Sequence, residues 1–205
     1  MSVNSLYVPV VSCPLNCDGI VRDARTHIPR GFFTLAKEGQ PIKLFVVAQN
    51  PGQPWGAQIN AYAKLNPEQK VRQQFQLVRD AMIGDERRTF QVRLVAWLST
   101  ILSVPERNVF EHVVYSNVVK CTTPNNRKPL QTLAQTCASR HLSRELDFWQ
   151  PAITVGLGGA ASSYLSKLGI KHESMPHPSN RECKVDNDRL IERLRIKIHS
   201  ISAHG

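Results

Sequence analysis

The sequence predicts an α/β fold, a three-layer sandwich around a central, largely parallel four-stranded sheet. Short apolar runs rich in β-branched residues alternate with longer segments in which apolar residues recur every three or four positions. Strands that alternate with helices along a chain form a largely parallel sheet, because each helix carries the chain back across the sheet before the next strand begins.

The first half of the chain contains the clearest elements. Residues 43–50, KLFVVAQN, form an apolar run that Pro51-Gly52 ends, as expected of a buried strand. Residues 68–103 have helical periodicity, and Gly84-Asp85 is expected to divide them into two helices. The aromatic residues of the second helix, Phe90 among them, are expected in the core.

The second half continues the alternation. We expect strands at residues 112–120, 152–157 and 170–175, and helices at residues 130–148, 160–168 and from residue 186 onward. The carboxyl ends of parallel strands meet at one edge of a sheet, and ligands of such folds bind there. The segments expected at that edge are residues 49–50, 117–121, 156–159 and 176–180.

The length of 205 residues suits one domain, covering residues 1–205, better than two. No apolar run reaches the roughly 18 residues of a membrane span, so no membrane partner is expected. No basic segment precedes the apolar stretch at the N-terminus, so no secretory signal is expected either. We expect a cytoplasmic protein, and a monomer.

The charge balance favours a polyanionic partner. Lys and Arg together number 26 against 16 Asp and Glu, which gives a formal net charge of +10. Such a surplus binds phosphates through the release of counterions, so DNA or RNA is the expected partner. On charge alone, the alternative that this is a basic protein with no nucleic-acid role stays open.

Four cysteines fall in two pairs, Cys13 with Cys17 and Cys121 with Cys137. A chain of this length buries a sufficient core without disulfides, and paired cysteines in a reducing cytosol more often bind metal. Four thiolates suit either tetrahedral zinc or a 4Fe-4S cluster, and spacing alone does not decide between them. Either group would tie the N-terminal arm to the loop after residue 120.

The run Gly156-Leu157-Gly158-Gly159 superficially matches a dinucleotide-binding pattern. It follows a late strand, and no acidic residue ends a strand about 20 positions later, as that motif requires. We therefore expect no nucleotide cofactor. Backbone N–H groups at the start of the following helix can instead hold a DNA phosphate, which makes Gly158 and Gly159 candidate DNA contacts.

Three motifs occur in an order that resembles the uracil-DNA glycosylase superfamily. AQNPG at residues 48–52 and HPS at residues 177–179 resemble its two active-site motifs. SNVVKCTTPNNR at residues 116–127 resembles a stretch of the iron–sulfur, family 4 branch, where the step from Cys121 to Cys137 also separates two cluster ligands. The resemblance covers the chain from Cys13 to about Arg181, and it favours a 4Fe-4S cluster over zinc on the four cysteines.

The resemblance implies a monofunctional DNA glycosylase, a hydrolase that extrudes uracil or another altered pyrimidine from DNA and cleaves its N-glycosidic bond. His177 would donate a hydrogen bond to the departing base, and Asn50 would position the attacking water. Asn117, with Gln49 nearby, would read the edge of the base. No motif places a lysine to form a Schiff base, so no lyase activity is expected.

Residues beside the motifs are candidates for contact with DNA. Trp55 is a candidate for stacking on the base, with simple packing as the alternative. Arg181 takes the position of the residue that fills the vacated stack, with a phosphate contact as the alternative. The remaining candidate DNA contacts are Gly158, Gly159, Ser179, Lys120 and Arg127.

The sequence departs from the family 4 pattern beside the first motif. Asn50 stands where that branch has alanine, and the following segment, GQPWGAQINAYAKLN, does not match it. The identity of the excised base therefore stays open, and a bulky modified cytosine of phage DNA, removed in defence, is an alternative substrate. A catalytically inactive nucleic-acid-binding module and a zinc-stabilised enzyme acting on small nucleotides are alternatives from other classes.

Overall fold

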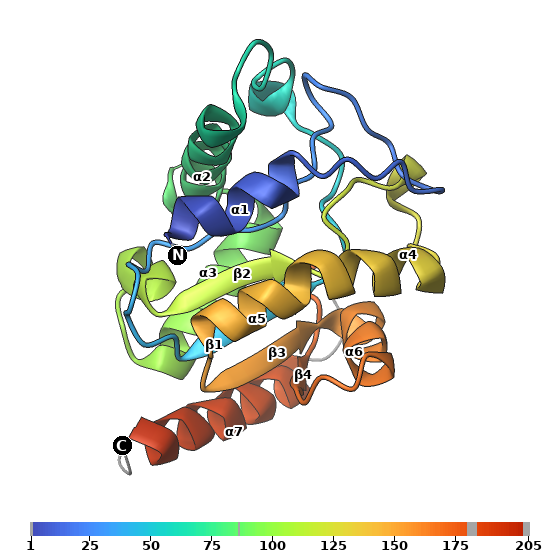
Figure 1. Ribbon diagram of the computed structural model, residues 1–205. Coiled ribbons are helices and arrows are strands. Elements are labelled where there is room, and N and C mark those ends of the chain that lie inside the picture. The colour runs from blue at the N-terminus through green and yellow to red at the C-terminus, as the bar shows by residue number, and fades with distance from the viewer. Residues whose placement is uncertain (1, 86, 180–183, 203–205) are drawn as a thin grey trace.

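A central sheet of four parallel strands organises the computed structural model, which describes residues 2–85, 87–179 and 184–202 (Figure 1). The strands run in the spatial order β2-β1-β3-β4, and every pair of neighbours is parallel. The predicted α/β class and parallel four-stranded sheet are therefore confirmed. The strands are β1 (Leu44–Ala48), β2 (Val113–Asn117), β3 (Ile153–Leu157) and β4 (Glu173–Met175).

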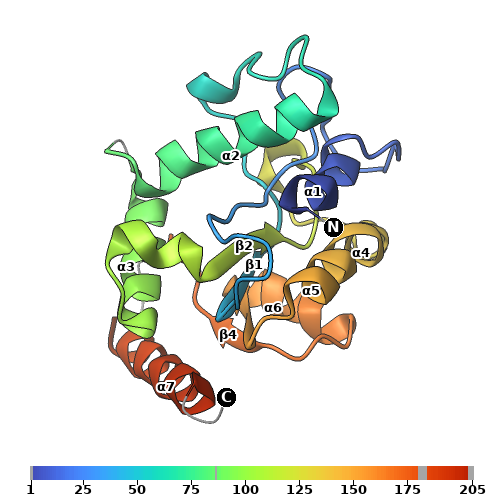
Figure 2. The same cartoon turned by 60° about the vertical axis from the view of Figure 1, so that its left-hand side comes forward.

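Helices cover both faces of the sheet and complete the predicted three layers (Figures 1 and 2). Side chains of β1 alternate between the two cores, with Phe45 and Val47 facing one and Leu44 and Val46 the other. Both faces of β1 are buried, which explains its unbroken apolar run. The first face carries α1 (Val3–Val11), α4 (Gln131–Cys137), α5 (Ser143–Trp149) and α6 (Gly158–Lys167). The second carries α3 (Thr89–Leu102) and α7 (Lys184–Ser202).

The predicted break at Gly84 is confirmed, because α2 (Pro67–Ile83) ends there before α3 begins. A capping box fixes the start of α2: the Gln69 backbone N–H donates to Asn66, and the Asn66 backbone N–H donates to the Gln69 side chain, both at 2.9 Å. Figure 2 shows α2 crossing above the strands, and its side chains reach both cores.

The predicted helix at residues 130–148 contains an irregular turn. A π-helical turn, Ala138–Leu142, lies between α4 and α5, directly after Cys137. Such turns occur frequently at functional sites.

The helix α1 was not expected from the sequence, because its β-branched residues and the internal Pro9 have weak helix propensity. Its buried residues Tyr7 and Val10 belong to the core of the first face. Tertiary packing therefore stabilises α1 where local propensity does not.

The strand order places a crevice at one edge of the sheet. The chain leaves β1 for β2 on one side and then crosses to β3 on the other, so the connections diverge between β1 and β3. Ligands of open α/β sheets bind at the carboxyl ends of such a pair of strands. Within the described ranges, no helix has both the length and the apolar character needed to cross a membrane.

Candidate active site

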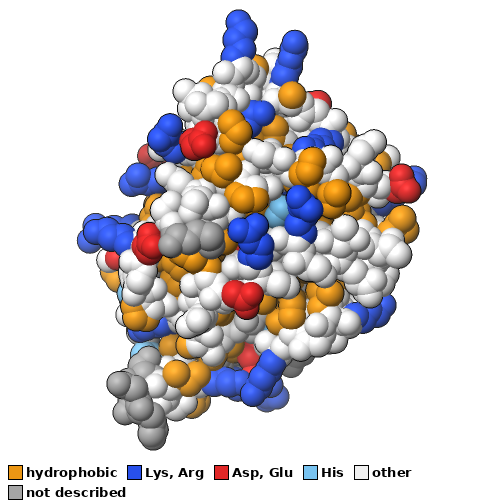
Figure 3. Space-filling view, in the orientation of Figure 1, with side chains coloured by type: hydrophobic (Ala, Val, Ile, Leu, Met, Phe, Trp, Pro, Cys, Tyr) orange, Lys and Arg blue, Asp and Glu red, His pale blue; other side chains and the backbone are white. Residues whose placement is uncertain are grey.

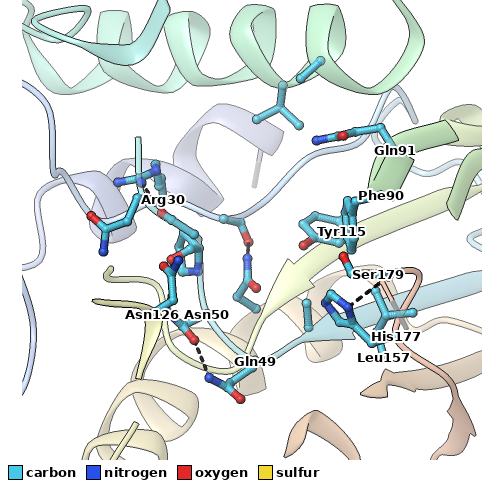
Figure 4. A pocket seen from close by; sticks show the side chains of 18 of the residues that line it. Arg30, Gln49, Asn50, Phe90, Gln91, Tyr115, Asn126, Leu157, His177 and Ser179 are labelled. Carbon is cyan, nitrogen blue, oxygen red and sulfur yellow. Dashed lines mark hydrogen bonds between the residues drawn. The ribbon is translucent and has the colours of Figure 1, made fainter. Parts of the chain in front are cut away.

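A cavity of about 670 Å³ lies at the carboxyl ends of β1, β2 and β3 (Figure 4). Its volume falls within the range of about 300–1,000 Å³ that is usual for small-molecule sites. Most of the residues selected from the motifs line it, namely Gln49, Asn50, Trp55, Asn117, Gly158, Gly159, His177 and Ser179. The fold therefore brings the two short motifs and the start of the third to one site.

Asn50 lies just beyond β1, where the chain leaves the sheet. Its Oδ1 accepts a hydrogen bond from the Gln49 side chain at 2.7 Å. Its Nδ2 donates to the Pro51 carbonyl at 3.1 Å and to Thr123 Oγ1 at 3.2 Å. Thr123 in turn donates to the Arg127 carbonyl at 2.6 Å. These contacts fix the amide, and the second lone pair of Oδ1 can still accept a hydrogen bond from water.

Asn117 ends β2 directly beside Ala48 of β1 and is 1% exposed. Its Nδ2 donates to the Gly31 carbonyl at 3.0 Å, and its Oδ1 is buried without a partner. The Gly31 contact defines the orientation of the amide and leaves Oδ1 as an acceptor for a ligand. Gly31 has φ +89°, and a Cβ there would lie 2.2 Å from Asn117 Nδ2, so only glycine allows this approach.

His177 follows β4 and lines the opposite side of the cavity from Asn50 (Figure 4). Its Nδ1 accepts a hydrogen bond from the Ser179 backbone N–H at 3.3 Å, so the neutral ring carries its proton on Nε2. Partial burial lowers the pKa of His177 below its ordinary value, which favours this neutral form. The ring of Phe90 lies 5.2 Å from the imidazole, and a Cβ on Gly158 would lie 3.1 Å from that of His177.

Aromatic side chains form part of the cavity wall. Trp55, Phe90 and Tyr115 all contribute to its wall. Phe90 packs against the second core, as predicted, and also faces the cavity. The structure therefore offers aromatic faces for an inserted base besides that of Trp55.

The prediction that Lys120 contacts DNA is wrong. Its side chain is 0% exposed, and its Nζ forms an ion pair with Glu145 Oε2 at 2.7 Å. Ser116 donates to the same carboxylate oxygen at 2.6 Å. Burial raises the pKa of Glu145, with the Lys120 charge opposing that shift. Lys120 is therefore a structural residue that joins β2 to α5.

Arg127, another candidate DNA contact, does not line the cavity. Arg127 is exposed in the loop before α4, and its carbonyl holds Thr123. Arg181 lies outside the described residues. Figure 3 shows Lys and Arg side chains spread over much of the visible face, where acidic side chains are fewer. This distribution agrees with the charge surplus of the sequence.

Four free cysteines, Cys13, Cys17, Cys121 and Cys137, line a second, small pocket. Burial and the neighbouring thiols raise the pKa of Cys121 to about 12 and that of Cys137 to about 11. The Lys120 backbone N–H donates to Cys137 Sγ at 3.2 Å.

The side chain of Arg22 donates to the carbonyls of Leu15, at 2.7 Å, and Cys13 in the N-terminal loop. The fold thus brings the two cysteine pairs together. Within the described ranges, however, no His, Cys, Asp or Glu side chains form a group of three or more arranged to hold a metal ion.

Several residues of the site were not predicted from the sequence. Thr123 belongs to the third motif, so its presence beside an expected strand end was a usable signal. Gly31, Phe90 and Gln91 reach the cavity from distant segments, and no local pattern marks them. Gln58 lies in the segment that did not match the family 4 branch.

Comparisons with known proteins match most of the chain to one family. A model described as the uracil DNA glycosylase superfamily matches residues 37–195. A type-4 uracil-DNA glycosylase of Saccharolobus solfataricus is 35% identical over 83 residues, which cover 40% of this chain and 36% of that protein. A type-4 uracil-DNA glycosylase of Sulfurisphaera tokodaii is 39% identical over 66 residues, which cover 32% and 30%. The chain thus spans about a third of the length of these relatives.

Proposed function

The chain belongs to the uracil DNA glycosylase superfamily, and from this premise we propose that it is a monofunctional DNA glycosylase that excises uracil or another altered pyrimidine. One observation carries the proposal: Asn50, Asn117 and His177, far apart in the sequence, line one cavity of sufficient volume for a nucleobase. A base inside a duplex is inaccessible to such a cavity, so the nucleotide must rotate out of the stack. The names of the two relatives support uracil as the first base to test.

His177 stabilises the leaving group. Cleavage of the glycosidic bond leaves negative charge on the departing base. A hydrogen bond from Nε2–H to a base oxygen strengthens as that charge grows, by the same logic as an oxyanion hole. The contact from Ser179 to Nδ1 keeps the proton on Nε2, where this role requires it.

Asn50 positions the attacking water through its side-chain oxygen. An amide has no useful basicity, so this residue contributes orientation and not proton abstraction. Gln49 and Thr123 hold the amide in place from two sides. The reaction therefore depends mainly on stabilisation of the leaving group.

Asn117 reads the edge of the extruded pyrimidine. Its free Oδ1 accepts a hydrogen bond from a ring or exocyclic N–H, and the Gly31 carbonyl keeps the amide from turning over. Trp55 and Phe90 offer aromatic faces to the base.

We propose backbone contacts to DNA phosphates from Gly158, Gly159 and Ser179, which lie together on the cavity wall. The backbone N–H groups of the two glycines begin α6, and the start of a helix favours bound anions. Arg127, which is exposed in the loop that also contains Thr123, is a further candidate for contact with DNA phosphates. The protein would act as a monomeric single domain in the cytoplasm, where a reducing environment keeps Cys13, Cys17, Cys121 and Cys137 out of disulfides.

We propose that Cys13, Cys17, Cys121 and Cys137 hold a 4Fe-4S cluster. All four are free thiols that line one pocket, a donor set that suits iron–sulfur chemistry. The raised pKa values of Cys121 and Cys137 result from burial and from repulsion by neighbouring thiols, and positive iron would stabilise these two thiolates against both effects. The cluster would fix the N-terminal arm against α4. No catalytic step requires it.

Single-turnover excision from a uracil-containing duplex tests the proposed function. His177→Ala and Asn50→Ala should each slow excision by about 10²–10³-fold while binding DNA with unchanged affinity. The matched controls are His172→Ala and Asn108→Ala, which remove the same groups outside the cavity. Near-normal rates in both site variants would refute the assignment.

Borohydride trapping tests the monofunctional mechanism. The reagent joins protein to DNA only when a lysine or amino terminus forms a Schiff base with the sugar. We expect no adduct, because the lysine that follows β2, Lys120, is fully buried and paired with Glu145. A covalent adduct on a substrate duplex would contradict the proposal.

A bulkier modified pyrimidine is the second candidate substrate, and the cavity volume of about 670 Å³ favours it. Duplexes carrying uracil, hypoxanthine and modified cytosines, followed by alkaline cleavage of abasic sites, would rank these bases directly.

A further inference from the structure

Two amides must be held at a fixed separation for the proposed reaction, Asn50 beside the attacking water and Asn117 at the base. Pairing of β1 with β2 fixes their separation only in part. Among the described residues, backbone hydrogen bonds between the two chains continue past the strands as far as the bond from the Val119 N–H to the Gln49 carbonyl, at 3.0 Å. Asn50 lies directly beyond that bond, so another contact must hold the two chains together there.

Arg30 bridges the two chains beyond the end of this pairing. Its backbone N–H donates to the Lys120 carbonyl at 2.7 Å, and its guanidinium donates to the Gly52 carbonyl at 2.8 Å. Lys120 lies beyond β2 and Gly52 lies beyond β1, so one residue contacts both chains. The Thr122 hydroxyl donates to the same Gly52 carbonyl at 3.3 Å. Figure 4 shows Arg30 on the same side of the cavity as Asn50.

The residue after Arg30 packs between the base-reading amide and the turn of the first motif. The Gly31 carbonyl accepts a hydrogen bond from Asn117 Nδ2 at 3.0 Å. A Cβ on Gly31 would lie 2.2 Å from Asn117 Nδ2 and 2.9 Å from Pro51 Cγ, so Gly31 is in close contact with both. A displacement of Arg30 therefore moves the surroundings of both amides.

The stability of the fold does not by itself explain an arginine at this position. Arg30 is 2% exposed, and within the described ranges its guanidinium donates to neutral carbonyls, that of Gly52 and, at 3.4 Å, that of Ile28. Burial lowers the pKa of Arg30, so its neighbours do not fully offset the lost hydration. Apolar side chains of similar volume often replace buried ionic groups without loss of stability. A planar guanidinium instead suits the fixing of chain segments at defined angles.

We propose that Arg30 is a positioning residue that sets the separation between the amide of Asn50 and the amide of Asn117. It acts through its contacts to Gly52 and through the adjoining Gly31. This inference rests on the proposed function, and it adds to that function a residue that lies in none of the three motifs.

The first test measures single-turnover excision, DNA affinity and thermal unfolding, on the duplex whose base the wild-type protein excises fastest. Arg30→Met and Arg30→Lys should each slow excision by about 10–100-fold, since small misplacements of positioning groups have effects of that size. Both should bind DNA with unchanged affinity and melt close to the wild-type temperature. Arg30→Gln replaces the methionine variant if that variant does not fold.

The lysine variant separates geometry from charge. An ammonium on a flexible stem keeps the positive charge of Arg30 but does not reproduce the planar guanidinium, so lysine should not rescue the rate. The matched control is Arg87→Met, which removes a partly buried guanidinium that pairs with Glu106 and does not line the cavity. This control should keep the wild-type rate. A wild-type rate in either Arg30 variant would overturn the inference.

The second test uses double variants to identify the residues through which Arg30 acts. In the Asn117→Ala background, Arg30→Met should slow excision by about threefold or less, because a separation between two amides has no effect once one is absent. In the His177→Ala background, where the missing ring lies across the cavity, Arg30→Met should slow excision by its full factor. Equal factors in the two backgrounds would overturn the inference, since a general loss of stability would act equally in both.

Failure of this inference and failure of the proposed function give different results. Excision by the wild-type protein, with wild-type rates in the Arg30 variants, refutes the positioning role and leaves the proposed function intact. An absence of abasic sites on every duplex treated with the wild-type protein refutes the proposed function and the positioning role together.

Discussion

Replacement of Gly31 by alanine tests the geometry of the base-reading residue without changing any polar side chain. The new Cβ would lie 2.2 Å from Asn117 Nδ2 and 2.9 Å from Pro51 Cγ, so the Asn117 amide must move. The backbone at φ +89° costs an alanine about 1–2 kcal/mol. Loss of the buried hydrogen bond between Asn117 and the Gly31 carbonyl adds about 1–3 kcal/mol.

Gly39→Ala is the matched control. Gly39 has φ +77°, and a Cβ there meets nothing within 4 Å. The control therefore has the backbone cost of about 1–2 kcal/mol without the collision. Comparison of the two variants isolates the displacement of Asn117.

The assay combines thermal unfolding with single-turnover excision. Gly31→Ala should lose about 1–3 kcal/mol more stability than Gly39→Ala and should excise about 100-fold more slowly, because small misplacements of a positioning group have effects of that size. Gly39→Ala should retain the wild-type rate. If Gly31→Ala melts like the control and keeps normal excision, the proposed role of Asn117 is wrong.

Further predictions concern charge, metal and pH. Lys120→Met leaves the Glu145 carboxylate buried without its ion-pair partner, so it should lower the free energy of unfolding by about 3–5 kcal/mol, or the melting temperature by about 6–20 °C. The double variant Lys120→Met with Glu145→Leu should recover most of that loss. Equal melting temperatures of the single and double variants would contradict this prediction. Cys121→Ser should abolish the broad absorbance near about 400 nm expected of anaerobically purified protein, and a colourless wild-type protein containing zinc would contradict the proposed cluster. The lowered pKa of His177 predicts excision rates that stay flat as pH falls from about 8 to about 6.5 and decline only below, so a midpoint above about 6.5 would contradict the neutral donor.

The elements with strong local patterns were predictable. The apolar run that became β1 and the glycine break after α2 both lie where the sequence placed them, within a residue or two. The helix α1 depends on packing of Tyr7 and its neighbours into the first core, which no local propensity reveals. The π-helical turn after Cys137 likewise leaves no distinct pattern in the sequence.

The residues of the site also divide into those that a local sequence pattern predicts and those that depend on tertiary packing. Asn50, Asn117 and His177 lie at or near the carboxyl ends of expected strands, and the topology of a parallel sheet brings them to one edge. The burial of Lys120 depends on a carboxylate supplied by α5, and the access of Gln91 depends on the packing of α3. Both the burial of Lys120 and the position of Gln91 on the cavity wall result from contacts between distant segments. The local sequence pattern therefore gave a wrong prediction for Lys120 and none for Gln91.

The most direct test of the central claim is the crystal structure of the protein bound to a duplex that carries 2′-fluoro-deoxyuridine, a nucleotide that resists excision. We expect an extruded base inside the cavity, with one edge at hydrogen-bonding distance from Asn117 Oδ1 and a base oxygen facing His177 Nε2. A nucleotide that stays stacked in the duplex, or a base bound on another surface, would contradict it.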